Sequence, residues 1–111
     1  METVDIDTII TAGGAKQVKS IPILTDSLSV TTYFLEPGKR IPAHVHNRFD
    51  EINYIVKGNG YITIENERHD VRSGMLVLVP RTKSHYFSAN TDELVVLSFN
   101  QINGTDEMHG P

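Results

Sequence analysis

The sequence predicts an all-β domain, either a sandwich or a barrel, and three observations support this. Residues 21–100 divide into short runs rich in β-branched and aromatic side chains. Turn residues, mainly Gly, Pro, Asn and Asp, separate these runs at intervals of about eight to twelve positions. No part of this range repeats apolar residues at the 3.6-residue period of an amphipathic helix. Many short strands with frequent turns are typical of sandwiches and barrels.

The individual strands are predicted from where each apolar run stops. Residues 28–35 form a strand that ends at the turn dipeptide Pro37-Gly38. Asn66-Glu67 is a predicted hairpin turn between two later runs. The remaining predicted strands, each followed by a turn signal or by Pro, are 52–56, 61–64, 69–71, 75–79, 85–89 and 94–99.

Length and charge limit the domain organisation and the classes of partner. The 111 residues suit one small domain with a single core. We divide the chain into an N-terminal segment (1–20), a β-barrel (21–102) and a flexible C-terminal tail (103–111). The net charge is −4, and no block of Lys and Arg stands out. We therefore expect no nucleic-acid partner and no anionic membrane surface as partner.

The sequence also carries signals about the compartment. It has no cysteine, which excludes disulfides and thiolate metal sites and fits a reducing compartment. Residues 1–7 are acidic, whereas a secretory signal begins with positive charge. The longest strongly apolar run, 75–79, is too short to span a bilayer. We predict a cytoplasmic protein with no membrane association.

Two predicted strands, 52–56 and 75–79, carry apolar residues on both faces. Strands of this kind are typically covered on both sides. Because no helix is predicted between residues 21 and 100, the second cover is expected to come from another subunit. We therefore predict a homodimer.

The stretch 38–58 carries the candidate functional residues. His44 and His46 are two positions apart, so on a strand both imidazoles leave the same face. Glu51 follows the polar break 47–50, which is long enough for the chain to turn and return beside the first strand. Two imidazoles and a carboxylate form a donor set suited to Fe, Mn, Ni, Co or Zn. His85, on a later strand, is a candidate fourth ligand.

The spacing of these residues resembles the two signatures of the cupin superfamily. Two positions depart from the second signature: Thr82 stands where a glycine is usual, and Ala89 stands where an asparagine is usual. Both positions shape turns in the family, so the ligand set is unaffected. The matching residues are Gly38, His44, His46, Glu51 and Gly58 in the first signature, and Gly74, Pro80 and His85 in the second.

The resemblance implies a small single-domain cupin, which is a double-stranded β-helix or jelly-roll barrel. In metal-binding cupins the residues that match His44, His46, Glu51 and His85 hold one divalent ion per subunit in the mouth of the barrel. Three neutral imidazoles and one carboxylate would leave a divalent ion with a residual charge of about +1. A six-coordinate ion would keep open positions for water, substrate or O₂.

Strand alternation identifies candidate neighbours of this site. Asn53 shares the face of Glu51 and would contact a ligand or satisfy a nearby backbone group. Phe87 shares the face of His85, either as a pocket wall or as part of the core. Arg40 could reach an anionic substrate at the rim, or it could be an ordinary solvated arginine. Tyr33 and Tyr61 are candidate lining residues whose facing the sequence does not decide.

Two functions agree with these residues. The first is a metal-dependent enzyme acting on a small oxygenated molecule, by dioxygenase chemistry or by Lewis-acid isomerase, lyase or decarboxylase chemistry. The alternative is a non-catalytic module that binds or senses a metal or a small molecule, because one scaffold can host both. A sugar-nucleotide epimerase of the related family would need a His/Asp/Tyr acid–base group and a longer chain. The sequence identifies no general base.

Overall fold

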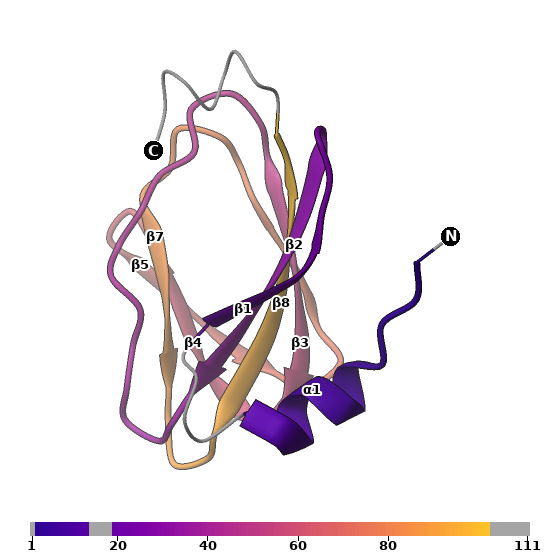
Figure 1. Cartoon of the computed structure of the whole chain (residues 1–111). Coiled ribbons are helices and arrows are strands. Elements are labelled where there is room, and N and C mark those ends of the chain that lie inside the picture. The colour runs from indigo at the N-terminus through magenta and orange to yellow at the C-terminus, as the bar shows by residue number, and fades with distance from the viewer. Residues whose placement is uncertain (1, 14–18, 103–111) are drawn as a thin grey trace.

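The computed structural model describes residues 2–13 and 19–102, which form one short helix and eight strands (Figure 1). All strand pairings among them are antiparallel. The predicted tail, 103–111, lies outside the described residues. The elements are α1 (Ile6–Gly13), β1 (Lys19–Leu24), β2 (Leu28–Leu35), β3 (Glu51–Lys57), β4 (Asn59–Ile64), β5 (Glu67–Arg72), β6 (Leu76–Val79), β7 (His85–Ala89) and β8 (Leu94–Gln101).

Two sheets face each other and enclose the interior (Figure 1). The larger sheet has the strand order β1-β2-β8-β3-β6, and the smaller sheet has the order β5-β4-β7. The long connection between β2 and β3, residues 36–50, runs along β7 and is joined to it by two isolated bridges. These bridges pair Arg40 with Ser88 and His44 with His85. The predicted all-β fold is confirmed, and the connection adds a cover beside the smaller sheet.

Helix α1 was not predicted, although the sequence contains a signal for it. The Asp5 side chain accepts a hydrogen bond from the Asp7 backbone N–H at 3.0 Å, as an N-cap residue does. Ile6, Ile9 and Ile10 follow at helical spacing and are all partly buried. The helix has only eight residues, so its apolar pattern is brief within a segment of otherwise weak periodicity. In the part of the chain described, no helix has the length and apolar character to cross a membrane.

The hairpin between β4 and β5 turns one residue earlier than predicted. β4 ends at Ile64 and β5 begins at Glu67, so the turn residues are Glu65 and Asn66. Glu65 has a φ of 57°. Its carboxylate accepts the Ser84 backbone N–H at 2.8 Å, and its own N–H donates to the Ser84 carbonyl at 2.8 Å. These contacts to a distant segment favour a turn that local residue preferences did not indicate.

The interior changes from apolar to polar along the strands. On β3, Ile55 is buried near one end, and Asn53 and Glu51 are buried toward the other. On β8, Leu94 and Val96 precede Ser98 in the same way. One end of the barrel is therefore filled by a hydrophobic core, and the other end holds buried polar groups. The core comprises Leu35, Ile41, Ile55, Ile62, Val71, Val79, Phe87, Ala89, Leu94 and Val96.

The outer face of β3 and β6 is apolar and exposed in the single chain, and it is the face that the predicted second subunit would cover. Leu76 is 70% exposed and Leu78 is 55% exposed, opposite Tyr54 and Ile52 respectively. Phe99 of β8 pairs with Ile52 on its other side and is 41% exposed. Because the alternation along β3 sends Glu51 and Asn53 inward, these apolar side chains face outward. We call Ile52, Tyr54, Leu76, Leu78 and Phe99 the outer apolar patch.

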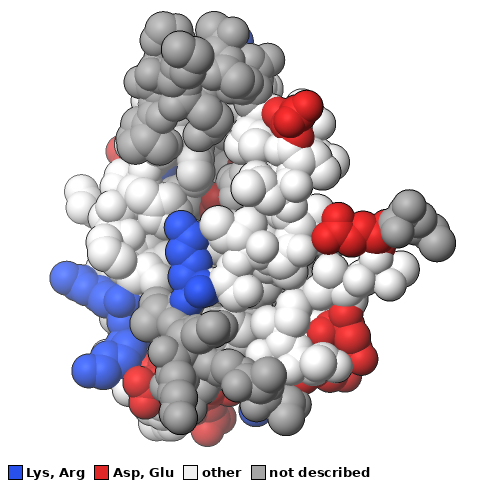
Figure 2. Space-filling model, viewed as in Figure 1, with Lys and Arg blue, Asp and Glu red and all other residues white. Residues whose placement is uncertain are grey.

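Charged residues on the face shown in Figure 2 stand in small separate groups. Basic groups lie mainly at the left of this view, and acidic groups lie mainly at the right and bottom. A nucleic-acid surface would need a continuous basic stripe.

Candidate metal centre

The four predicted ligands meet at the polar end of the barrel. Glu51 and His85 are the first residues of β3 and β7, whereas His44 and His46 lie on the connection between β2 and β3. A strand had been expected at His44 and His46. The connection is not a regular strand, but it is paired to β7 at His44. The His44 N–H donates to the His85 carbonyl at 3.0 Å, and the His85 N–H donates to the His44 carbonyl at 2.9 Å. Two of the predicted ligands are therefore joined directly through their backbones.

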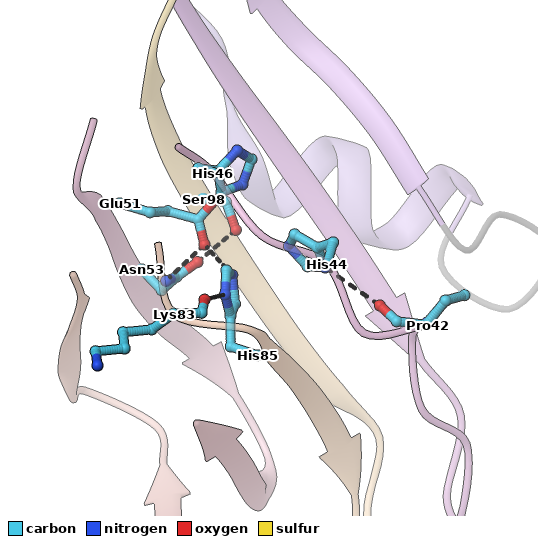
Figure 3. Close-up of polar contacts among 8 residues, drawn as sticks. All are labelled: Pro42, His44, His46, Glu51, Asn53, Lys83, His85 and Ser98. Atoms are coloured by element: carbon cyan, nitrogen blue, oxygen red, sulfur yellow. Dashed lines mark hydrogen bonds and ion pairs between the residues drawn. The ribbon is translucent and has the colours of Figure 1, made fainter. Parts of the chain in front are cut away.

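The side chains converge closely (Figure 3). One potential ligand atom from each of the four residues lies within 4.8 Å of the others. Glu51 is central: its Oε2 lies 2.9 Å from His46 Nε2, and its Oε1 lies 3.1 Å from His85 Nε2. Glu51 and His85 are buried, and His44 and His46 are partly buried. The sequence-based prediction that these four residues lie together is met by the geometry.

Backbone carbonyls orient two of the imidazoles. His44 Nδ1 contacts the Pro42 carbonyl at 3.2 Å, and His85 Nδ1 contacts the Lys83 carbonyl at 3.0 Å. A carbonyl can only accept, so each Nδ1 carries the hydrogen. In a neutral imidazole the Nε2 lone pair is then available for a metal ion. Histidine ligands in metal sites are commonly held in this way.

The pKa values show how strongly these groups interact. Burial raises the pKa of Glu51, but the contacts with His46 and His85 outweigh this effect and hold it well below its usual range. Burial lowers the pKa of His85, but the hydrogen bonds to Glu51 and to the Lys83 carbonyl raise it above its ordinary value overall. The pKa of His44 is lowered, chiefly by burial. Glu51 is therefore a carboxylate at neutral pH, which is the form a metal ion needs.

A chain of hydrogen bonds extends from Glu51 into the larger sheet. The Asn53 amide donates to Glu51 Oε1 at 3.0 Å, and the Ser98 hydroxyl donates to Asn53 Oδ1. All three side chains are buried. Contact with a ligand residue was one of two roles expected for Asn53, and its hydrogen bond to Glu51 agrees with that role, whereas Ser98 was not predicted. Ser98 faces Asn53 because β8 pairs with β3 in that register, and the sequence does not specify which strands are neighbours.

The other predicted lining residues lie elsewhere. Phe87 is fully buried within the hydrophobic core. Arg40 is exposed, with its guanidinium carbon 5.0 Å from the centroid of the Tyr86 ring. Tyr61 lies on β4, where this strand pairs with β5, and its ring contacts Arg68. The guanidinium carbon of Arg68 is 3.8 Å from the ring centroid. Tyr33, by contrast, lines a cavity together with His46 and Glu51.

This cavity has a volume of about 290 Å³ and opens beside the ligand cluster. Its walls come from β1, β2 and the end of β8, and two ligand residues form its inner end. Ligand pockets generally range from about 300 to 1,000 Å³, so this one suits a small molecule. A molecule in the cavity would reach His46 and Glu51 directly.

The donor set fits a transition-metal ion. Imidazole nitrogens and a carboxylate suit Fe, Mn, Ni, Co and Zn. The His46 Nε2 atom is buried and lies close to Glu51, yet it has no aligned hydrogen-bond partner among the described residues. A metal ion would give this buried nitrogen an aligned partner. The fold and the site together define a small β-barrel with a buried site able to hold a metal ion.

The chain belongs to the cupin domain family, whose model matches residues 31–99. The TT1209 protein of Thermus thermophilus has a similar fold, with a TM-score of 0.81 at 20% identity over 93% of this chain and 99% of that one. The predicted cupin jelly-roll fold is therefore confirmed.

Two further matches cover a smaller share of the relative's length. A putative sugar phosphate isomerase from Acidithiobacillus ferrooxidans has a TM-score of 0.62 at 29% identity, over 68% of this chain and 51% of that one. The MJ1618 protein of Methanocaldococcus jannaschii is 33% identical over 48 residues, which are 43% of this chain and 38% of that protein. The chain thus spans about half or less of the length of these two relatives.

Proposed function

We propose that the chain binds one divalent transition-metal ion through His44, His46, Glu51 and His85, and that it is a metal-dependent enzyme acting on a small oxygenated molecule. The observation that carries this proposal is the convergence of the four ligand atoms within 4.8 Å, at the inner end of a cavity. Sites with open coordination positions beside a cavity are typical of catalysis rather than of structural metal binding.

The candidate ions are Fe, Mn, Ni, Co and Zn. A bound ion would supply either O₂ chemistry or Lewis-acid stabilisation of an enolate-like charge. The Lewis-acid branch is favoured by the description of one solved relative as a putative sugar phosphate isomerase. The residues of this chain would hold the ligand set in place: the carbonyls of Pro42 and Lys83 orient two imidazoles, and Asn53 orients the carboxylate. The absence of cysteine supports a reducing compartment, for which we propose the cytoplasm.

Elemental analysis and a turnover screen test this proposal together. Protein purified without chelator and supplied with metal should contain close to one divalent ion per chain. The loaded protein should then turn over a member of a panel of diketones, catechols and hydroxy acids. Oxygen uptake would separate dioxygenase from Lewis-acid chemistry. Metal binding without any turnover would favour the alternative, a binding or sensing module. Failure to bind metal would contradict the proposed enzyme and leave only a module that binds a small molecule.

Replacing His46 by Ala should abolish tight metal binding while preserving the β-rich fold. His46 is partly exposed on a connection outside the core, so its removal should leave the core intact. Metal titration measures the affinity, and circular dichroism measures the fold. His69→Ala is the matched control, because His69 is exposed on β5. Equal metal affinity of the two variants would show that the site lies elsewhere.

A further inference from the structure

One residue that lines the cavity beside the ligand cluster is a cationic side chain that takes no part in the proposed metal site. Lys19, the first residue of β1, is the only lysine or arginine among the described residues that line it. Within the described chain Lys19 has no ion-pair partner. Lys19 therefore has an ammonium group available at the wall of a cavity whose inner end is formed by His46 and Glu51.

Tyr33 stands beside Lys19 and shares this cavity. The two residues are direct partners in the register of β1 and β2, and both line the cavity. Directly opposed side chains in an antiparallel pair have Cβ atoms about 4.5–5.5 Å apart. The two side chains therefore leave neighbouring strands side by side, and no hydrogen bond within residues 2–13 and 19–102 engages the phenol.

Tyr33 also connects this pair to the ligand cluster. Burial, and next the negative charge of Glu51, raise the pKa of the Tyr33 phenol. The phenol thus lies within electrostatic reach of Glu51, and it keeps its proton at neutral pH as a hydrogen-bond donor. Tyr33 therefore lies between the two groups in the chain of interactions: it interacts with Glu51 of the proposed metal site and is the strand partner of Lys19, and all three residues line the cavity.

We propose that this cavity selects substrates with a carboxylate at the end opposite their metal-chelating oxygens. The Lys19 ammonium and the Tyr33 hydroxyl receive the carboxylate, and aliphatic side chains of Ile21 and Leu24 contact the short body between the two ends. The inference rests on the proposed function, because the other end of the substrate binds at the metal site. It adds a class of substrate: small hydroxy or oxo acids with a second, remote carboxylate.

The charges favour a carboxylate over a phosphate. One ammonium balances one carboxylate, whereas a phosphate dianion would leave one negative charge unbalanced beside Lys19. Phosphate sites also generally offer several backbone N–H donors, at a helix N-terminus or a nest of amides. Apart from His46 and Ile102, the described cavity lining comes from strands, and this lining includes no helix N-terminus.

A matched pair of acids tests the proposal. 2-Hydroxyglutarate and 2-hydroxypentanoate share the chelating hydroxy-acid end and the chain length, and they differ in the remote carboxylate. Binding of each to Mn(II)-loaded protein is measured by calorimetry, after elemental analysis has established the metal content. Wild-type protein should bind 2-hydroxyglutarate about five- to tenfold more tightly, as expected for a partly enclosed charge-assisted hydrogen bond.

Two lysine variants complete the design. Lys19→Met should reduce this preference to below about twofold without changing the metal content, because Lys19 is exposed and outside the ligand cluster. Lys39→Met changes the charge equally at an exposed residue that does not line the cavity, and it should keep the preference. Tyr33→Phe should lose part of the preference.

The outcomes separate this inference from the proposed function. Fully metal-loaded wild-type protein that binds both acids equally, or a Lys19→Met variant that keeps the preference, would overturn the substrate class and leave the metal site standing. Tighter binding of glycerol 3-phosphate than of 2-hydroxyglutarate would overturn the carboxylate assignment. Absence of bound metal would overturn the proposed function, and with it this inference.

Discussion

Thr82 shows how a single residue connects backbone strain to the candidate site. Its φ is 72°, a left-handed conformation that β-branched residues rarely adopt. In this conformation its N–H donates to the His46 carbonyl at 2.6 Å. The cupin signature usually has glycine at this position, and the structure gives the reason: the turn requires a left-handed residue. Thr82 meets that requirement at an energetic cost.

Replacing Thr82 by Gly should therefore stabilise the protein by about 1 kcal/mol, because relief of strain exceeds the extra entropy of an unfolded glycine. Urea unfolding measures the change. Thr91→Gly is the control, since Thr91 lies in an exposed turn and is not among the described residues with positive φ. Equal destabilisation of both variants would show that Thr82 carries no strain.

Metal affinity should fall on acidification, because protons compete with the metal ion for the histidines. In metal-free protein the raised pKa of His85 means that its proton binds more tightly than usual and competes with metal already above pH 6.5. The lowered pKa of His44 delays its own protonation to more acidic pH. We expect the logarithm of the affinity constant to fall first by about one per pH unit, then more steeply. Metal titrations from pH 8 to pH 4.5 measure this, and unchanged occupancy at pH 4.5 would contradict the ligand assignment.

At the scale of elements, the sequence predicted strands β2 to β8 better than it predicted their neighbours, and β1 was not predicted as a strand. The run 28–35 coincides with β2, and alternation placed Asn53 on the face of Glu51, because both features depend on local residue order. Ser98 lies 45 residues from Asn53, and only the pairing of β8 with β3 brings the two together. The Lys19–Tyr33 pair likewise depends on strand register. Local patterns therefore identified the candidate ligands, and the long-range pairing determined their surroundings.

Close packing between elements explains one glycine of the first signature. Gly58 joins β3 and β4 with a φ of 88°, and a Cβ atom there would lie 1.7 Å from the Glu93 carbonyl oxygen. Gly38 and Gly74 also have positive φ, but a Cβ atom at either would have no neighbour within 4 Å. Gly58 is thus required for space as well as for conformation, whereas the other two are required for conformation alone.

Gly58→Ala should destabilise the fold by more than about 3 kcal/mol, because the backbone at Glu93, which packs against Gly58, must move. Gly38→Ala and Gly74→Ala should each cost about 1–2 kcal/mol, the cost of a left-handed alanine. Chemical denaturation of the three variants measures the difference. Similar losses at all three positions would contradict the packing argument.

At the scale of the whole molecule, the outer apolar patch supports the predicted homodimer. Its residues are neighbours in one sheet, since Ile52 pairs with both Leu78 and Phe99. Contiguous exposed apolar surface on a small protein commonly marks an interaction site. A second copy of the chain could cover β3 and β6 in the way their two-faced apolar pattern indicates.

The double substitution Leu76→Asp and Leu78→Asp should convert a dimer into a monomer, because four carboxylates would enter each symmetric interface. Sedimentation equilibrium at about 10–50 µM protein, a range that reveals micromolar dimers, measures the mass. Leu24→Asp adds charge at an exposed residue on the cavity side of β1 and should leave the dimer intact. A wild-type protein that remains monomeric in this range would contradict the prediction.

The reciprocal backbone pairing of His44 and His85 has a consequence for how an ion would enter and leave. These two residues are held by the sheet and not by the ion, and Glu51 begins a strand that is paired on both sides. A chelator should therefore extract the ion and leave a folded receptor, unlike a zinc finger, whose apo form is unfolded. Exchange of one ion for another would then require no refolding, so the identity of the resident ion would follow the supply of free metals as much as the preference of the protein.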